Sequence, residues 1–362
     1  MKKILIITPA LSGGGAERVA VNLANEWRQM GCAVDLLSIR YINDYEGAIH
    51  PDVTVHTIGS RRVRYSIFAL RSRIREIDPD MILSVMRSTN ILTAAALPIN
   101  SRARVGFREA NPLHAVRNLA WYHRALMVRF MRLAYKRAHV VIANSPDTLD
   151  DLQDSGIALR NGRVIFNPVI SPSIYRHCSA SSPHPWLADP DAKVIVSAGR
   201  LHYQKDYFTL LRAFARLAKE MGSVKLLILG KGEEEEALKK FASDLGILSK
   251  VDFLGFVENP WVYMKQADVF ALSSRWEGFG NVLVESFACG TPVVVTDCSG
   301  GPRIITQDGA LGRLVPVGND VEFATALADT LDKPPPKKAL EARAMEFSVE
   351  TIAKQYWEAI SN

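Results

Sequence analysis

Short apolar runs alternate with longer amphipathic stretches along the first half of the chain. Lys3–Thr8 is a β-rich apolar run, and Ala16–Met30 after it has the periodicity of an amphipathic helix. Further strands are expected at Ala33–Ile39, Val53–Ile58, Met81–Met86, Ala103–Phe107, Val140–Asn144 and Arg163–Phe166. Strands separated by helical segments predict βαβ units and a parallel sheet.

The same alternation starts again after residues 171–191, where Ser and Pro become frequent. This composition is typical of a linker between domains. The strands expected beyond it are Val194–Ala198, Lys225–Leu229, Val251–Phe253, Val269–Leu272, Val293–Thr296 and Leu314–Pro316, with helices over Asp206–Glu220 and Glu233–Leu245. We therefore expect an α/β protein with an N-terminal domain over 1–170, a C-terminal domain over 192–345 and a cleft between them.

A last amphipathic segment, Phe347–Ile360, follows the proline break at Pro334–Pro336. We expect a C-terminal helix within residues 346–362. One hypothesis is that this helix crosses back to the N-terminal domain, and the pattern alone does not test it.

Composition limits the classes of protein to which the chain can belong. Hydrophobic residues make up 48% of the 362 residues, which is typical of a globular protein. The net charge of +6 favours an anionic partner, and nucleic acid, an acidic membrane and phosphorylated small molecules all remain open.

The first apolar run ends at Thr8-Pro9, too soon for a signal peptide, and no segment reaches the roughly 18 apolar residues of a membrane span. The cysteines form no CxxC pair and predict reduced thiols in a cytosolic protein: Cys32, Cys178, Cys289 and Cys298.

The most informative motif places two carboxylates, Glu277 and Glu285, around the glycine loop Gly278-Phe279-Gly280. Such a loop leaves backbone N–H groups bare and lets a phosphate approach closely. A glycosidase pair of acids is the alternative, but Glu277 precedes the loop whereas Glu285 lies in the first turns of the following helix. The motif therefore predicts a site for a sugar attached to a nucleotide diphosphate.

A second glycine motif, Gly13-Gly14-Gly15-Ala16-Glu17-Arg18, follows the first strand and opens a helix. It lacks the third glycine of a dinucleotide fingerprint, and Asp35 falls inside the next strand rather than at its end. A purely structural turn is a further alternative. We favour a loop that faces an anion in the cleft.

Two cations and two glycine turns follow strands of the second half. Gly199-Arg200 comes after Val194–Ala198, with Lys205 at the start of the next helix, and Gly230 begins a turn after Lys225–Leu229. Arg can donate to two phosphate oxygens and Lys supplies a point charge, so the pair suits a diphosphate. Taken alone, the two cations would be interpreted as solvated side chains. Because Glu277 and Glu285 lie in the same half of the chain, phosphate binding is the better interpretation.

Leu113–Arg137 combines cations with aromatic and aliphatic residues and contains no acid. Such a segment fits an interfacial membrane helix or a site for a lipid-linked phosphate. The alternative is an ordinary helix packed on the first sheet with a cationic outer face. The cations of this segment are Arg117, Arg124, Arg129, Arg132, Lys136 and Arg137, and a second basic run consists of Arg61, Arg62, Arg64, Arg71, Arg73 and Arg75. Nucleic acid is the weaker partner because the sequence contains no recognised nucleic-acid module.

Neither Asp78-Pro79-Asp80 nor Asp189-Pro190-Asp191 has the pattern of a metal site, and both are typical of turns. We expect no metal.

Taken together, Gly13–Arg18, Gly199-Arg200 with Lys205, Gly230–Gly232 and Glu277–Glu285 resemble the family-4 retaining glycosyltransferases. The resemblance spans nearly the whole chain and implies the GT-B fold, two facing Rossmann-like domains. Within the family the chain is most similar to bacterial enzymes that extend sugars on polyprenyl diphosphate carriers or otherwise build surface polysaccharide.

The resemblance also implies roles for the residues. Arg200 and Lys205 would bind the donor diphosphate and stabilise the departing nucleotide, and Glu277 would hold hydroxyls of the donor sugar. Glu285 would bind the ribose. The other donor-binding residues would be Gly14, Gly15, Gly199, Gly230, Gly278, Phe279, Gly280, Asn281 and Val282.

The reaction implied is retaining transfer of a hexose or N-acetylhexosamine from a nucleotide sugar, UDP rather than GDP, to a polyprenyl-diphosphate-linked saccharide. The resemblance implies no metal and no cofactor, because the nucleotide sugar is the co-substrate. The implied location is cytoplasmic and peripheral, on the inner face of the cytoplasmic membrane. Acceptor and membrane contacts are expected at Arg117, Arg124, Arg129, Arg132 and Lys136. Transfer to a soluble acceptor and a catalytically silent GT-B scaffold in a polysaccharide assembly complex are the alternatives.

The sequence departs from the family pattern at one place. Ala110 occupies the position in Gly106–Asn111 where family members often carry a histidine that contacts the transferred sugar. Glu109, Asn111 or His114 is expected to replace that contact.

Overall fold

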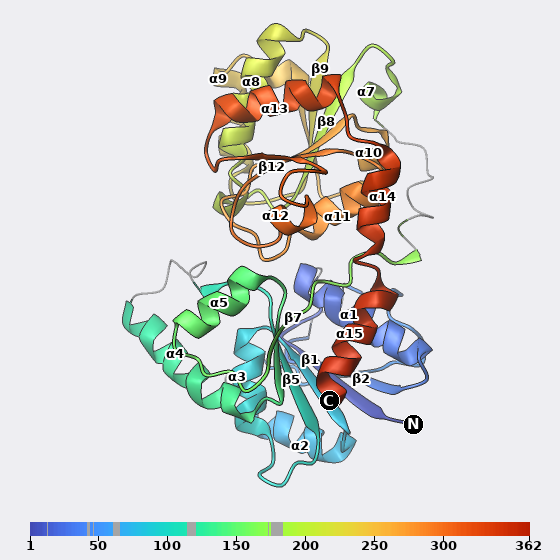
Figure 1. Cartoon of the computed structure of the whole chain (residues 1–362), viewed down its shortest axis with the longest axis vertical. Helices are drawn as coiled ribbons and strands as arrows, with labels where there is room; N and C mark the ends of the chain where they lie inside the picture. Colours follow the sequence, from blue (N-terminus) through green and yellow to red (C-terminus); the bar gives the residue numbers. More distant parts are fainter. Residues whose placement is uncertain are drawn as a thin grey trace. The chain divides into compact units, whose positions relative to one another are not determined.

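The computed structural model describes residues 1–12, 14–41, 44–45, 47–60, 66–113, 121–172, 174 and 184–362. The chain divides into two compact units (Figure 1). Unit 1 contains Met1–Val169 together with Ser348–Asn362, and unit 2 contains Ile170–Phe347. The polypeptide therefore leaves the first unit once and returns to it at its C-terminal end.

Unit 1 is built on a parallel sheet of order β3-β2-β1-β4-β5-β6-β7. The strands are β1 Lys3–Thr8, β2 Ala33–Ser38, β3 Thr54–Thr57, β4 Met81–Val85, β5 Arg104–Glu109, β6 Val140–Ala143 and β7 Gly162–Val164. The helical segments are α1 Gly15–Gln29, α2 Ile67–Ile77, α3 Arg87–Ala96, α4 Trp121–Ala134, η3 Tyr135–Arg137, α5 Pro146–Asp154 and α15 Val349–Ser361.

Both faces of this sheet are buried, which explains why its strands are nearly continuous apolar runs. In β1, Ile4 and Ile6 point to one core and Leu5 and Ile7 to the other, because successive side chains of a strand alternate. The first core lies under α1 and α15, and the second lies under α2, α3 and α4.

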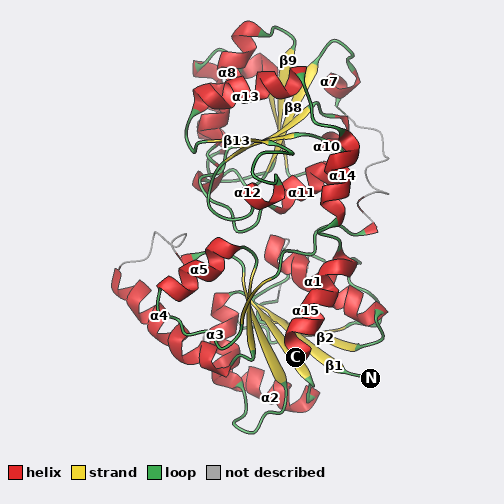
Figure 2. Cartoon of the chain, viewed as in Figure 1, coloured by secondary structure: helices red, strands yellow, loops and turns green. Residues whose placement is uncertain are grey.

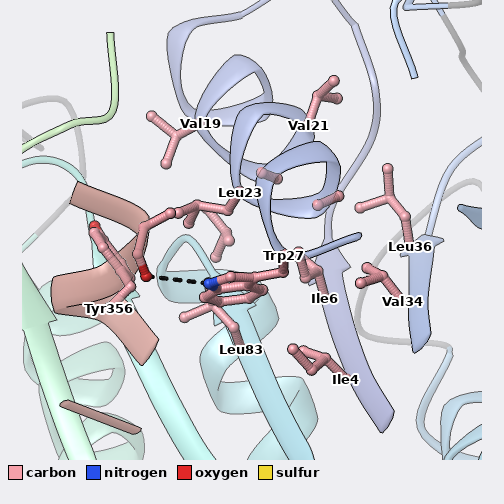
Figure 3. Packing of buried hydrophobic residues seen from close by; sticks show 14 of the residues in the cluster. Ile4, Ile6, Val19, Val21, Leu23, Trp27, Val34, Leu36, Leu83 and Tyr356 are labelled. Atoms are coloured by element: carbon pink, nitrogen blue, oxygen red, sulfur yellow. Dashed lines mark hydrogen bonds between the residues drawn. The ribbon is translucent and has the colours of Figure 1, made fainter. Parts of the chain in front are cut away.

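The C-terminal helix α15 is part of the first core (Figure 3). Ser348 caps it by accepting a hydrogen bond from the N–H of Thr351. Trp27 of α1 donates its indole N–H to the carbonyl oxygen of Ala353 over 3.1 Å. Arg108 of β5, fully buried, donates Nε to the Tyr356 hydroxyl at 3.0 Å. Contacts to both a helix and the sheet hold residues 349–361 in unit 1.

Unit 2 has a parallel sheet of order β10-β9-β8-β11-β12-β13 with helices on both faces (Figure 2). Its strands are β8 Lys193–Ala198, β9 Val224–Leu229, β10 Val251–Gly255, β11 Val269–Leu272, β12 Val293–Thr296 and β13 Arg313–Val315. Its helical segments are α7 Pro185–Ala188, η4 Tyr203–Lys205, α8 Tyr207–Glu220, α9 Glu235–Asp244, η5 Leu248–Lys250, α10 Pro260–Gln266, α11 Asn281–Ala288, α12 Pro302–Ile305, α13 Asp320–Asp332 and α14 Lys337–Met345.

The elements differ from the sequence prediction in a few places. The prediction placed no helix between residues 317 and 346, where α13 and α14 form. The last helix starts at Val349 rather than Phe347, and the Phe347 ring instead packs on Phe279 of unit 2 with ring centroids 5.4 Å apart. Of the predicted linker, residues 173 and 175–183 lie outside the described part, and α7 lies within the rest. None of the helices in the described ranges is long and apolar enough to cross a membrane.

Candidate functional site

The predicted donor residues of unit 2 gather at the carboxyl ends of its strands. The loops that carry them follow β8, β9 and β11, and ligands of open α/β sheets bind at this edge. Because β9, β8 and β11 are neighbours in the sheet, residues far apart in the sequence come together.

A buried ion pair joins two of these loops. Lys205 Nζ lies 2.6 Å from Glu277 Oε1, and the Ser274 hydroxyl donates to the same carboxylate oxygen over 2.5 Å. Glu277 is only 5% exposed, so the pair is held away from bulk water, where its electrostatic attraction is stronger. The sequence predicted both residues as site residues but did not predict that they would pair.

Asp206 fixes the backbone beside Lys205. It adopts a left-handed conformation with φ of 47°, which Asp tolerates better than most residues. The hydroxyl of Ser273 donates to the carbonyl oxygens of Lys205 and Asp206 at 2.9 and 3.0 Å. Asp206 also pairs with Arg275 at 3.0 Å. These contacts tie the β8 loop to the β11 loop and hold the lysine in place.

Glycine is required where the β8 and β9 loops touch. A Cβ on Gly230 would lie 1.9 Å from the carbonyl oxygen of Gly199, and one on Gly232 would lie 2.0 Å from that of Leu201. This close approach brings two exposed cations, Arg200 and Lys231, onto adjacent loops. Within the part of the chain that the structure describes, neither cation has an acidic partner. Lys231 is a residue that the sequence interpretation passed over, although its place in the glycine turn was a usable signal.

The loop Gly278–Gly280 packs on a second glycine turn that the sequence interpretation missed. A Cβ on Gly300 would lie 2.2 Å from the carbonyl oxygen of Glu277, and one on Gly301 would lie 2.0 Å from that of Phe279. Ser299 accepts a hydrogen bond from the Glu277 N–H at 3.0 Å. The signal was Gly300-Gly301-Pro302, which follows the predicted strand Val293–Thr296 after three residues.

The loop ends at the N-terminus of α11. Gly280 is its N-cap with φ of 93°, and Asn281 and Val282 begin the helix, whose first turn contains no acid. Such an end favours an anion. Glu285 lies one turn further along α11 and is 6% exposed.

The glycine motif of unit 1 opens a helix, as the sequence predicts. Gly14 caps α1 and Gly15 begins it, while Gly13 lies outside the described residues. The Glu17 carboxylate folds back onto this end, where a Cβ on Gly14 would lie 2.3 Å from its Oε2. A carboxylate in the first turn of a helix competes with a phosphate for the helix end. That this loop faces an anion stays a prediction.

Glu109 is committed to contacts within unit 1. It is 1% exposed and accepts hydrogen bonds from Arg87 at 3.1 Å, from Asn90 at 3.0 Å and from the hydroxyl of Tyr135. Burial and the Glu109 charge raise the pKa of Tyr135 well above its usual value. Of the three residues considered in place of the missing histidine, Glu109 is therefore structural, Asn111 is exposed, and His114 lies outside the described residues.

The outward face of α4 is apolar as well as basic. Four large side chains project into solvent, Tyr122 (54% exposed), Leu126 (50%), Phe130 (50%) and Leu133 (61%). Their spacing of four, four and three residues puts them in one stripe along the helix. Met131 on the opposite face is fully buried.

The cations of this region divide into two groups. Arg129, three residues after Leu126 and four before Leu133, lies on the apolar stripe, whereas Arg124 lies off it. Arg132 and Arg137 donate to backbone carbonyl oxygens of Ser155 and Ala94, and Arg71 does so to Ala96. Lys136 is exposed, Arg73 pairs with Glu76, and Arg75 is in the last turn of α2. Arg61, Arg62, Arg64 and Arg117 lie outside the described residues.

No group of three or more His, Cys, Asp or Glu side chains that could hold a metal ion is present among the residues with a described placement.

Two family models together cover most of the chain. The model described as Glycosyltransferase Family 4 matches residues 13–170, and the model described as Glycosyl transferases group 1 matches residues 181–347.

Two relatives of similar length come from Campylobacter jejuni. The N-acetylgalactosamine-N,N'-diacetylbacillosaminyl-diphospho-undecaprenol 4-alpha-N-acetylgalactosaminyltransferase is 28% identical over 95% of this chain and 94% of its own length. The GalNAc-alpha-(1->4)-GalNAc-alpha-(1->3)-diNAcBac-PP-undecaprenol alpha-1,4-N-acetyl-D-galactosaminyltransferase is 26% identical over 100% of this chain and 99% of its own. Among solved structures, Anabaena Alr3699/HepE in complex with UDP-glucose matches with a TM-score of 0.78 at 25% identity, covering 100% of both chains. With the two parallel sheets, these likenesses confirm the predicted α/β class and GT-B fold.

Proposed function

The chain belongs to the family 4 glycosyltransferases, and from this premise we propose that it moves a hexose or N-acetylhexosamine from UDP to a saccharide on a polyprenyl diphosphate. The observation that carries the proposal is the Lys205–Glu277 pair, which lies beside the glycine loop at the carboxyl edge of the unit 2 sheet. Two relatives named for transfer onto undecaprenyl-diphosphate-linked sugars support the acceptor class.

The donor diphosphate binds between exposed cations and a helix end. Arg200 and Lys231 come from adjacent loops, Lys205 from the same loop as Arg200, and the N-terminus of α11 adds backbone N–H groups. All of these groups stabilise negative charge, which grows on the diphosphate as the bond to the sugar breaks. The charge that a divalent metal supplies in other transferases comes here from the protein.

Glu277 holds the donor sugar rather than attacking it. Its Oε1 already accepts hydrogen bonds from Lys205 and Ser274, which lowers its nucleophilicity. Retention then proceeds on one face of the sugar. The acceptor oxygen bonds to the anomeric carbon as the carbon–phosphate oxygen bond breaks, and the acceptor proton passes to the departing phosphate oxygen. Glu285 on α11 binds the ribose hydroxyls.

The apolar stripe of α4 binds the cytoplasmic face of the membrane in which the acceptor is anchored. Insertion removes Tyr122, Leu126, Phe130 and Leu133 from water, and Arg129 on the same stripe meets anionic headgroups. This arrangement favours a peripheral enzyme over one with a soluble acceptor.

The test is nucleotide release from a panel of UDP- and GDP-sugars, with and without a polyprenyl-diphosphate-linked saccharide. Release that requires one donor and the lipid supports the proposal. Equal activity on a short water-soluble acceptor would favour a soluble acceptor, and absence of release and of nucleotide binding would favour a scaffold.

Replacement of Lys205 by Met should abolish transfer. Lys193→Met is the matched control and should not abolish it, because Lys193 forms a partly exposed ion pair with Asp268 at the amino ends of the strands.

Membrane binding has its own test. Leu126→Ser combined with Phe130→Ser should abolish sedimentation with anionic vesicles and leave nucleotide binding intact. Leu248→Ser combined with Val321→Ser is the matched control, because these side chains are 45% and 54% exposed in unit 2. Loss of vesicle binding in both variants, or in neither, would rule out a specific role for α4.

A further inference from the structure

An aromatic pair, the exposed Tyr203 and the half-buried Trp276, lies close in sequence to the two residues of the unit 2 ion pair. The Tyr203 ring is 52% exposed, and the Trp276 ring lies with its centroid 6.1 Å away at an angle of 54°. The guanidinium carbon of Arg275 lies 4.4 Å from the Tyr203 ring centroid, a cation–π contact. None of these three residues belongs to the donor site proposed above.

Hydrogen bonds tie together the two loops that carry the aromatic pair. Arg275 donates its N–H to the Gln204 carbonyl oxygen at 2.8 Å, and the Gln204 side chain donates to the Trp276 carbonyl oxygen at 2.9 Å. Arg275 is fixed in turn by Asp206, which is 2% exposed. An aromatic surface on loops that are already tied together loses less conformational entropy when a ligand covers it.

The position of the pair points to the sugar end of the donor. Trp276 immediately precedes Glu277, and Tyr203 lies two residues before Lys205. A glycosidic bond joins two sugar rings directly, so the accepting ring must lie next to the ring that Glu277 holds. The nucleobase is separated from that ring by the diphosphate and the ribose. Phe256 is another exposed aromatic residue of unit 2, but it follows the edge strand β10. Two strands, β9 and β8, separate β10 from β11, after which Glu277 lies, so Phe256 is not next to Glu277.

We propose that Tyr203 and Trp276 form the subsite for the accepting sugar ring, an inference that rests on the proposed transferase function. The apolar C–H face of a pyranose packs on the aromatic rings and excludes water, as apolar ligand faces do on aromatic pocket walls. The hydroxyls at the edge of the sugar ring remain available to polar groups such as Arg275 and His202. The subsite recognises a saccharide by the shape of its apolar face.

The test compares Tyr203→Ala and Trp276→Ala with the wild-type enzyme in a steady-state transfer assay. We expect the KM for the saccharide acceptor to rise about tenfold or more, with kcat changed much less. The Kd for UDP and the slow hydrolysis of the donor without acceptor should stay within about twofold, because the donor site is intact. Tyr203→Phe should keep the wild-type KM. Leu248→Ala, an exposed apolar residue just before β10 at the amino edge of the sheet, is the matched control.

Each other outcome overturns the inference in a distinguishable way. Weaker UDP binding with an unchanged acceptor KM would mean that the rings stack on the base. Unchanged acceptor KM and UDP affinity in folded variants would make the pair a surface feature. If the wild-type protein transferred no sugar to any acceptor, the proposed function itself would fail, and the subsite with it.

Discussion

At the scale of single residues, the buried environment of Glu277 determines how its carboxylate interacts with its neighbours. One of its two carboxylate oxygens, Oε1, accepts hydrogen bonds from both Lys205 and Ser274, and the side chain is nearly excluded from water. A charge in such a place is retained only if its partner is also charged or if a ligand needs it. Glu277 therefore neutralises Lys205, and in the proposed function it also presents a polar group to the donor sugar.

Replacing Glu277 by Gln separates these two effects. The amide keeps the size and a hydrogen-bonding oxygen but removes the charge that pairs with Lys205. We expect transfer to fall about a hundredfold, while UDP affinity stays the same or rises because Lys205 becomes available to the diphosphate. Initial rates and titration calorimetry measure the two quantities.

Glu285→Ala is the matched comparison for this prediction. It should weaken UDP binding, because we propose that this acid binds the ribose. Wild-type turnover in Glu277→Gln would show that the donor sugar lies elsewhere.

Cys298 tests the electrostatics of the same region. Burial and the nearby Glu277 carboxylate raise the pKa of its thiol to about 12. At pH 8 only about one thiol in ten thousand is then ionised, and the thiolate is the reactive form. With Cys178 replaced by Ser, we expect no alkylation by iodoacetamide at pH 8 in the folded protein and full alkylation in urea, read by mass spectrometry. Rapid alkylation of Cys298 in the folded protein would contradict the burial of this loop.

At the scale of elements, burial on both sheet faces is what made the strands predictable. Val194–Ala198 and Lys225–Leu229 were expected from their apolar runs and form β8 and β9. The helix α14 was not expected, because it buries only Leu340 and Ala344 and follows a proline cluster typical of a loop.

Candidate site residues could be found from sequence wherever a glycine turn marked them, as at Gly199 and Gly278. Contacts between residues that are far apart in the sequence could not be predicted in this way. The contacts of Glu109 depend on Arg87 and Asn90 of α3 and on Tyr135 of η3, two elements other than its own. The apolar stripe of α4 can be recognised only once the buried side of that helix is known.

The α15 helix allows a direct measurement at this scale. Tyr356→Phe removes the hydroxyl that accepts the hydrogen bond of Arg108 Nε, and leaves a fully buried guanidinium nitrogen without that partner. We expect the free energy of unfolding to fall by about 1–3 kcal/mol, measured by urea denaturation. Tyr41→Phe changes the same group on an 86% exposed side chain and should have an effect within about 0.5 kcal/mol. Equal effects in the two variants would mean that the Arg108 contact does not stabilise α15.

At the scale of the whole molecule, the two units differ in how many segments of the chain form them. Unit 2 is one continuous segment, whereas unit 1 is completed by residues from the far end of the sequence. The two crossing points are adjacent, because the N–H of Ile170 donates to the carbonyl oxygen of Phe347 at 3.1 Å. A short glycine–serine linker can therefore join residue 169 to residue 348 without distortion.

This path predicts how the protein can be divided. A fragment of residues 170–347 should fold alone and bind UDP with near wild-type affinity, because Arg200, Lys205, Glu277 and Glu285 all lie in it. Residues 1–169 alone should not fold stably, since loss of α15 uncovers the first core and leaves the Trp27 indole without Ala353. Joining 169 to 348–362 should restore a cooperative unfolding transition, followed by circular dichroism. If 1–169 unfolded cooperatively without α15, that helix would be dispensable, and if folded 170–347 failed to bind UDP, unit 1 would have to supply part of the donor site.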